Sequence, residues 1–167
     1  MQKSIFSKIF IRSLIIYDPV GIIPFISKIG YVIIERKDYY KRALELNDET
    51  IKNRRYFHMN AEAGLHMPMA CVYVMDKLTE YGLVPSRCGE GVTATVGNGG
   101  KVLLLRADMD ALPMPEESGL PFACPTGKEA HACGHDFHAA MLLTAAKMLK
   151  ENEAELKGTV KFMFQPA

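Results

Sequence analysis

The sequence contains no tryptophan, only four cysteines among 167 residues, and nearly equal numbers of acidic and basic side chains. A formal net charge of +1 gives neither a basic field for nucleic acid nor an acidic tail. Four scattered cysteines do not make the dense framework of a small disulfide-linked secreted protein, so we expect free thiols in a reducing cytoplasm. The composition therefore favours one globular domain with a core of its own.

An uninterrupted apolar run of membrane-spanning length is also missing. Residues 1–34 are rich in Ile and Phe, but charged residues, Pro19 and Pro24 interrupt them, and a transmembrane helix needs about 18 apolar residues in a row. The segment lacks the apolar stretch and cleavage site of a signal peptide. Residues 3–17 fit an amphipathic helix on a membrane surface; the alternatives, which we favour, are a helix packed on a neighbour or a translated leader.

After about residue 43 the chain alternates between helical and strand patterns. Helices are predicted over residues 49–60 (with Asp48 as cap), 68–82 and 138–158. Strands are predicted within 93–100, over 101–108 as an apolar run buried on both faces, and over 159–167. The order of strand, helix and strand indicates an α/β fold with parallel neighbours.

Metal-binding side chains crowd into the short stretch "HACGHDFH". Such side chains stand at every second position from His131 through Cys133 to His135. In an extended segment, side chains at every second position point the same way. Cys sulfur and His nitrogen suit zinc and other borderline divalent metals. Asp136 either orients a ligating imidazole or caps the helix that follows, and His138 lies in the first turn of that helix. Two or three ligands do not complete a catalytic metal site, so the others must come from elsewhere.

Asp108 and Asp110 are candidates for that second contribution. They stand where the predicted strand 101–108 ends, and ligands of open α/β sheets gather outside the carboxyl ends of the strands. The spacing of two residues lets both carboxylates face one pocket. The alternative is that Asp108 caps a turn while Asp110 is solvated.

The remaining ionisable residues give weaker signals. Arg54 and Arg55 are typical of a solvated helix face, and Glu116 and Glu117 of solvent-facing loop charges. His58 lies in or at the end of the first predicted helix and has no spacing that marks it as a ligand. None of these residues is predicted to belong to the site.

Three motifs carry a resemblance to a known family. "RADMDALPM", "GKEAHACGHDFHAA" and "GTVKFMFQPA" follow "RRYFHMNAEAGL" in the family's order, from about residue 48 to Ala167. They resemble the amidohydrolase branch of the M20 metallopeptidases, which includes hippurate hydrolases, N-acyl-amino-acid amidohydrolases and auxin-conjugate hydrolases. The resemblance implies a zinc-peptidase-like α/β catalytic domain, with a mixed sheet flanked by helices. It also implies hydrolysis of the amide bond in N-acyl amino acids or dipeptide-like substrates.

The resemblance also implies roles for individual residues. The metal ligands that it implies are Cys133 and His135, and the residues expected to support them are Asp108, Asp110, His131, Asp136 and His138. Asp108 occupies the place of a His in the His-x-Asp metal motif of the wider family, which argues against direct ligation. Two divalent ions, manganese, zinc or cobalt, are implied for the full-length site, and a homodimer for the full-length protein.

Members of this family continue beyond "FQPA" with two glutamates, a general base and a further metal ligand, and with a lid or dimerisation domain. We therefore expect residues 44–167 to be the N-terminal part of the catalytic domain. We expect the isolated chain to be inactive, because the reaction needs the base and the complete ligand set. The alternative is a non-enzymatic half-domain that binds a metal or a partner.

Overall fold

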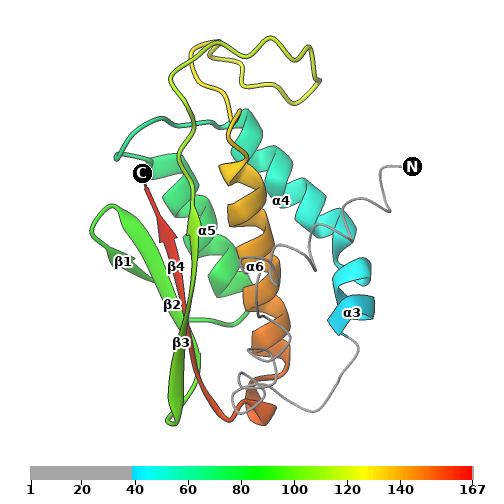
Figure 1. The fold of residues 1–167 in the computed structure, drawn as a ribbon, viewed down its shortest axis with the longest axis vertical. Coiled ribbons are helices and arrows are strands. Elements are labelled where there is room, and N and C mark those ends of the chain that lie inside the picture. Colours follow the sequence, from blue (N-terminus) through cyan, green and yellow to red (C-terminus); the bar gives the residue numbers. More distant parts are fainter. Residues whose placement is uncertain (1–38, 167) are drawn as a thin grey trace, which may run out of the picture.

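The computed structural model describes residues 39–166 (Figure 1). Its elements are, in chain order, α3 (Tyr39–Glu45), α4 (Asn47–Met59), α5 (Pro68–Glu80), β1 (Ser86–Cys88), β2 (Gly91–Gly97), β3 (Lys101–Asp108), α6 (His135–Glu151), the 3-10 turn η1 (Glu153–Glu155) and β4 (Gly158–Gln165). The predictions for residues 1–34 lie outside the described residues. Helix α3 crosses the boundary that we predicted at residue 43, and Arg42 in this helix pairs with Glu151 of α6 at 2.6 Å.

The four strands form one mixed sheet in the order β1-β2-β4-β3. β3 and β4 are parallel, with Lys101 opposite Gly158 and Asp108 opposite Gln165. β2 pairs with β4 in the antiparallel sense, and so does β1 with β2. The chain passes from β3 to its parallel partner β4 through α6, as a parallel connection requires. The predicted mixed α/β sheet with flanking helices is confirmed.

The hydrophobic core lies between one face of this sheet and helices α5 and α6 (Figure 1). Side chains of a strand alternate between its two faces, and the inward set of β4 consists of Val160, Phe162 and Phe164, all fully buried. Small residues let α6 pack closely. One face of the helix, formed by Leu142, Ala145, Ala146 and Leu149, is buried, as the helical pattern of this segment predicts.

Helices α4 and α6 run antiparallel, side by side. The hydroxyls of Thr50 and Thr144 share a buried hydrogen bond of 2.6 Å, and Lys147 pairs with Glu49 at 2.6 Å. This pairing brings the end of α4 next to the beginning of α6, where the predicted site begins. Within residues 39–166, each helix is too short or too polar to cross a bilayer.

Three predictions about individual elements were wrong. β3 is not buried on both faces: Val102 and Leu104, which share one face of the strand, are 63% and 54% exposed. The third helix runs over His135–Glu151 and stops well before Gly158, which instead opens β4. Asp48 lies inside the first turn of α4, whose N-cap is Leu46.

Candidate metal centre

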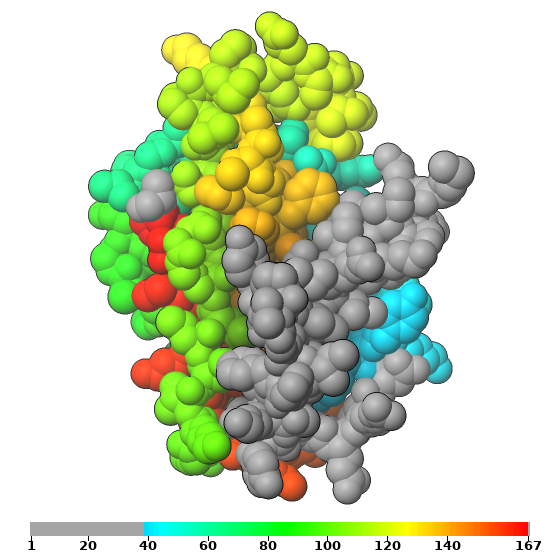
Figure 2. All heavy atoms as spheres, in the orientation of Figure 1, coloured from blue at the N-terminus to red at the C-terminus, as the bar shows by residue number. Residues whose placement is uncertain are grey.

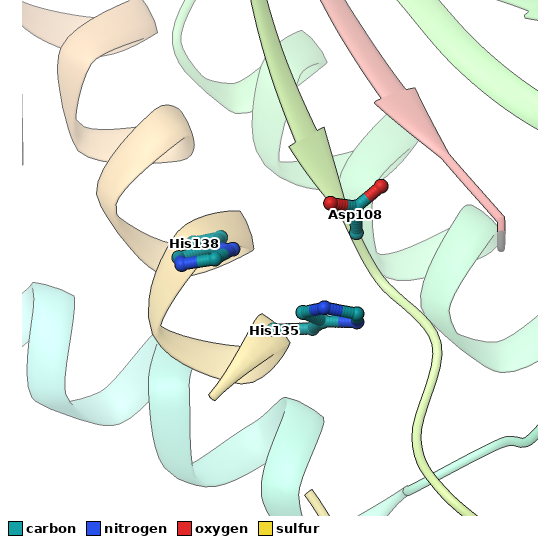
Figure 3. Close-up of side chains that lie close together, drawn as sticks. All are labelled: Asp108, His135 and His138. Carbon is teal, nitrogen blue, oxygen red and sulfur yellow. The ribbon is translucent and has the colours of Figure 1, made fainter. Parts of the chain in front are cut away.

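Asp108, His135 and His138 form the one group of metal-ligating side chains found among the described residues (Figure 3). One ligand atom from each lies within 4.8 Å of the other two. Asp108 ends β3, and both histidines lie in the first turn of α6, where a spacing of three residues places side chains on one face. Figure 2 shows the start of α6 at the surface beside β3.

Asp110 orients the imidazole of His135. The Nδ1 atom of His135 lies 2.8 Å from the Asp110 carboxylate and 3.0 Å from the Asp110 carbonyl oxygen. Both partners are acceptors, so Nδ1 carries the proton and Nε2 is the ring nitrogen left to bind a metal. This carboxylate–histidine pair is the arrangement that usually fixes a metal-ligating imidazole. Two imidazoles and a carboxylate suit zinc, manganese or cobalt, so the residues present fit a divalent metal.

The group overlaps only in part with the predicted ligands. It contains His135, as predicted, but it also contains Asp108 and His138, for which only supporting roles were predicted. Cys133 is an exposed free thiol outside the group. The extended alternation that we expected along the stretch ends at Gly134, which takes a φ of +94° and is the N-cap of α6. The assignment of Cys133 as a ligand therefore stays a prediction.

His131 and Asp136 face away from the group, into the protein. His131 is buried, and its Nδ1 atom has no hydrogen-bond partner among the residues described. Burial lowers the pKa of His131 to about 4, so this imidazole is neutral near pH 7. Asp136 is fully buried and accepts a hydrogen bond from the N–H of Phe137 at 2.9 Å. It does not occupy the N-cap position, which belongs to Gly134.

A buried ionic network, which sequence patterns did not predict, lies behind this turn. Arg54 lies 2.7 Å from Asp136, and His58 contacts both Asp136 and Glu116. The side chains of Arg54 and Glu116 are only 14% and 6% exposed, so the predictions of solvated charges were wrong for both. Glu117, in contrast, is exposed as predicted. The spacing of four residues between Arg54 and His58, on one helix face, was the only available signal.

A cavity of about 420 Å³ adjoins the network and is lined mostly by the long connection between β3 and α6. Its walls combine apolar side chains with ionisable ones, and they include His58, Met114, Glu116, Leu120 and His131. The cavity therefore lies beside the stretch that carries the metal-binding residues.

Comparison with known proteins bears directly on this region. The family described as "Peptidase family M20/M25/M40" matches residues 104–167, a range that includes the whole group of Asp108, His135 and His138. An N-acetyl-L-cysteine deacetylase of Bacillus subtilis (strain 168) is 40% identical over 126 residues, which are 73% of this chain and 30% of the relative. The matched part of the chain belongs to the M20 family.

Further relatives of this M20 chain have related names. The hippurate hydrolase of Campylobacter jejuni is 40% identical over 74% of this chain and 33% of its own length. An IAA-amino acid hydrolase of Arabidopsis thaliana is 38% identical over 81% of this chain and 30% of its own length. The M20 chain thus spans about a third of the length of these curated relatives.

Solved structures agree with the fold. A structure from Bacillus subtilis, described as a dinuclear metal-binding peptidase of the M20 family, matches with a TM-score of 0.70 and 37% identity over 74% of this chain and 36% of its own. An aminobenzoyl-glutamate utilization protein from Klebsiella pneumoniae matches with a TM-score of 0.60 and 25% identity over 76% of this chain and 38% of its own. The M20 chain therefore shares its backbone arrangement with about a third of each of these proteins.

Proposed function

We propose that residues 44–167 form part of the catalytic domain of a metal-dependent amidohydrolase that cleaves the amide bond of N-acyl amino acids. The observation that carries the proposal is the position of the group Asp108, His135 and His138. It lies at the carboxyl end of β3, within a stretch similar to enzymes named as deacetylases and hydrolases of N-acyl amino acids. The names of these relatives share one substrate class, an acyl group joined to an amino acid.

The residues hold the metal through different donor atoms. His135 binds through Nε2 while Asp110 holds its Nδ1, and His138 and Asp108 supply a second imidazole and a carboxylate. Cys133 is the further ligand that we proposed from the sequence. Two ions per site are supported by the description of the Bacillus structure as dinuclear, and zinc, manganese and cobalt all suit these donors. A bound divalent ion supplies Lewis acidity, which polarises an amide carbonyl and lowers the pKa of water.

The state of the cysteine thiols bears on the cellular compartment of the protein. All four cysteines are free, and Cys88 and Cys133 are exposed. Exposed thiols persist in a reducing compartment, and a Cys133 ligand must stay reduced to bind metal. The compartment that we propose is therefore the cytoplasm.

Metal binding is tested by titrating the chain with Co²⁺ and recording its visible absorption. We expect the His135→Ala variant to lose at least about tenfold in affinity, because even residues that only orient a ligand contribute 10- to 100-fold. His66→Ala is the control, because the His66 side chain is 79% exposed and pairs only with Glu90 in the described structure. Equal affinities of the wild type and His135→Ala would overturn the proposed site.

Hydrolysis is tested on the complete reading frame that contains residues 44–167. We expect turnover of N-acetyl amino acids and of hippurate that disappears after chelation and returns with added Mn²⁺, Zn²⁺ or Co²⁺. Turnover that persists through chelation, or none on any acyl amino acid with metal present, would contradict the proposed reaction.

A further inference from the structure

His58 lies between two buried carboxylates. Its Nδ1 atom is 2.7 Å from Asp136 Oδ2, and its Nε2 atom is 2.8 Å from Glu116 Oε1. Arg54, one helical turn before it on α4, lies 2.7 Å from the same oxygen of Asp136. The side chain of Asp136 has no exposed surface, and those of His58 and Glu116 are 7% and 6% exposed. The network joins α4, α6 and the connection between β3 and α6.

Each nitrogen of His58 faces a carboxylate oxygen, Nδ1 that of Asp136 and Nε2 that of Glu116. Nδ1 also lies 2.9 Å from Nη2 of Arg54, so the Arg54 guanidinium contacts both His58 and the Asp136 carboxylate. The rings of Phe122 and Phe137 cover the Arg54 guanidinium, with centroids 5.1 and 4.5 Å away. Buried charges are expensive even when paired, and their best-attested use is to fix one arrangement of packed elements.

The arrangement fixed here is the first turn of α6. The N-cap of this helix is Gly134, which has no side chain to cap it, although capping side chains commonly hold such ends. Asp136 holds this end instead, because it accepts a hydrogen bond from the N–H of Phe137 and is tied to α4 by His58 and Arg54. Asp136 stands between the two histidines of the metal group in sequence. Its fixed orientation therefore sets the rotation that turns His135 and His138 toward Asp108.

Glu116 extends the same restraint into the long connection. Its carboxylate accepts a hydrogen bond from the N–H of Cys124 at 2.8 Å and another from the hydroxyl of Ser118. Because both donors lie in the same connection as Glu116, the connection itself keeps the Glu116 carboxylate in place against His58. His58 is thus the only described side chain that contacts both Asp136 and Glu116.

We propose that His58 is a positioning residue for the metal centre: by holding Asp136 and Glu116 together, it fixes the first turn of α6 so that His135 and His138 bind metal jointly with Asp108. This inference rests on the proposed metal site, and it adds a residue that does not itself reach the metal. It predicts that loss of the His58 contacts weakens and alters metal binding although every ligand remains.

The test compares three variants of the chain, each titrated with Co²⁺. His58→Ala removes both contacts, His58→Asn keeps a donor close to the position of Nδ1 and facing Asp136, and His58→Gln keeps one that reaches Glu116. We expect Ala to lower Co²⁺ affinity by about 10- to 100-fold, the range for residues that orient ligands. Asn should restore most of this loss and Gln less, because only Asp136 is joined directly to the ligand turn. The visible spectrum of the saturated Ala variant should differ from that of the wild type.

A purely structural role predicts a different pattern. Stability, followed by urea unfolding, would then fall in the variants while the saturated Co²⁺ spectrum stayed that of the wild type, and this result would overturn the inference. If His58→Ala does not fold, the Asn and Gln variants decide, and equal affinities in these two would also overturn it. His66→Ala serves as the control, with wild-type affinity and spectrum expected.

Failure of the inference is distinguishable from failure of the proposed function. If the wild type binds Co²⁺, His135→Ala does not, and all His58 variants bind with wild-type affinity and spectrum, only the role of His58 is lost. If His135→Ala binds as tightly as the wild type, the proposed metal site is wrong, and the role of His58 falls with it.

Discussion

Asp136 combines an ionisable carboxylate with complete burial, and its neighbours are the buried His58 and the largely covered Arg54, whose side chain is 14% exposed. Replacing Asp136 with Ala leaves these two side chains without their shared partner. Breaking a buried ion pair in this way costs about 3–5 kcal/mol of unfolding free energy, and we expect a loss of that size in urea denaturation. Asp76→Ala, at an exposed position of α5, should change the same quantity by less than about 0.5 kcal/mol.

A loss below about 1 kcal/mol for Asp136→Ala would contradict this ionic network, because it would show that Arg54 and His58 find other partners or water. The metal-free chain is the right sample, since a bound metal adds stability of its own.

The surroundings of Glu116 predict that the unfolding free energy depends on pH in the acidic range. Burial would raise the pKa of Glu116, but hydrogen bonds from Ser118, Cys124 and His58 outweigh it and lower the pKa from 4.5 to about 2. A carboxylate with a depressed pKa adds stability above its unfolded value, and this contribution disappears as the pH falls toward the folded value. We therefore expect the metal-free chain to lose stability between about pH 4.5 and pH 2 through this group.

The measurement is urea unfolding at several pH values for the wild type and for Glu116→Gln. The variant should be less stable at pH 6 and should lose less stability than the wild type on acidification through that interval. Parallel pH profiles for the two proteins would show that Glu116 titrates alike in the folded and unfolded chain. Glu117→Gln, an exposed neighbour, is the matched control and should follow the wild type.

For individual residues, the sequence is a better guide to the candidate metal-binding side chains than to the burial of each side chain. Spacing drew attention to the pair Asp108 and Asp110 at a strand end, and it marked His131, Cys133 and His135 equally. The choice of Cys133 and His135 as ligands came from the family resemblance, and only His135 lies in the group with Asp108 and His138.

The low exposure of Arg54 and Glu116 was not predictable, because it depends on contacts between segments that are far apart in sequence. His58, on the same helix as Arg54, meets Glu116 across 58 residue numbers and Asp136 across 78. Charged side chains are seldom buried, so the usual expectation failed at both.

The elements were predicted well where the chain carries strong local signals. Pro68 opens α5 as expected, and Gly82 follows its end with a φ of +82°. The end of α6 was misplaced because residues 152–157 are polar and lack a strong stop, so that the helical pattern continues in the sequence. The chain instead leaves the helix at Asn152 and turns through η1.

The turn between β2 and β3 gives a paired test of backbone conformation. Gly97 and Gly99 have similar left-handed φ angles of +73° and +63°, but a Cβ on Gly97 would lie 2.3 Å from the carbonyl oxygen of Gly158, whereas a Cβ on Gly99 would meet nothing within 4 Å. Gly99→Ala should therefore cost about 1–2 kcal/mol from the φ angle alone. Gly97→Ala should cost about 1–3 kcal/mol more, from the contact with β4.

Both costs are measured as changes in unfolding free energy in urea. The difference between the variants isolates the packing of β2 against β4, since the conformational cost is shared. Equal losses would mean that the start of β4 moves away from Gly97 without cost.

For the whole molecule, the residue patterns predicted an α/β sheet with parallel neighbours, and the family resemblance added that the sheet is mixed. The group Asp108, His135 and His138 lies at the carboxyl end of a strand, where ligands of such sheets gather. Asp108 meets α6 there because the connection between the parallel strands β3 and β4 returns its helix to the sheet. Strand order was not predictable from local pattern. The run "KVLLL" is typical of a strand covered on both faces, and a sequence pattern does not tell which neighbours cover it.

The exposed apolar side chains and the unpaired edge of β3 predict self-association of the described fold. Val102 and Leu104 are 63% and 54% exposed, and among residues 39–166 this strand has β4 as its only partner. An apolar, unpaired strand edge is a template for pairing with another chain, and a lysine there opposes such pairing.

We expect Leu104→Lys to lower self-association of the chain in sedimentation velocity while changing its unfolding free energy by less than about 0.5 kcal/mol. Leu120→Lys is the control, because Leu120 is also exposed (41%) but lies in the connection before α6. Equal effects of the two substitutions would assign the association to general hydrophobicity, whereas an effect of Leu104→Lys alone would assign it to the edge of β3.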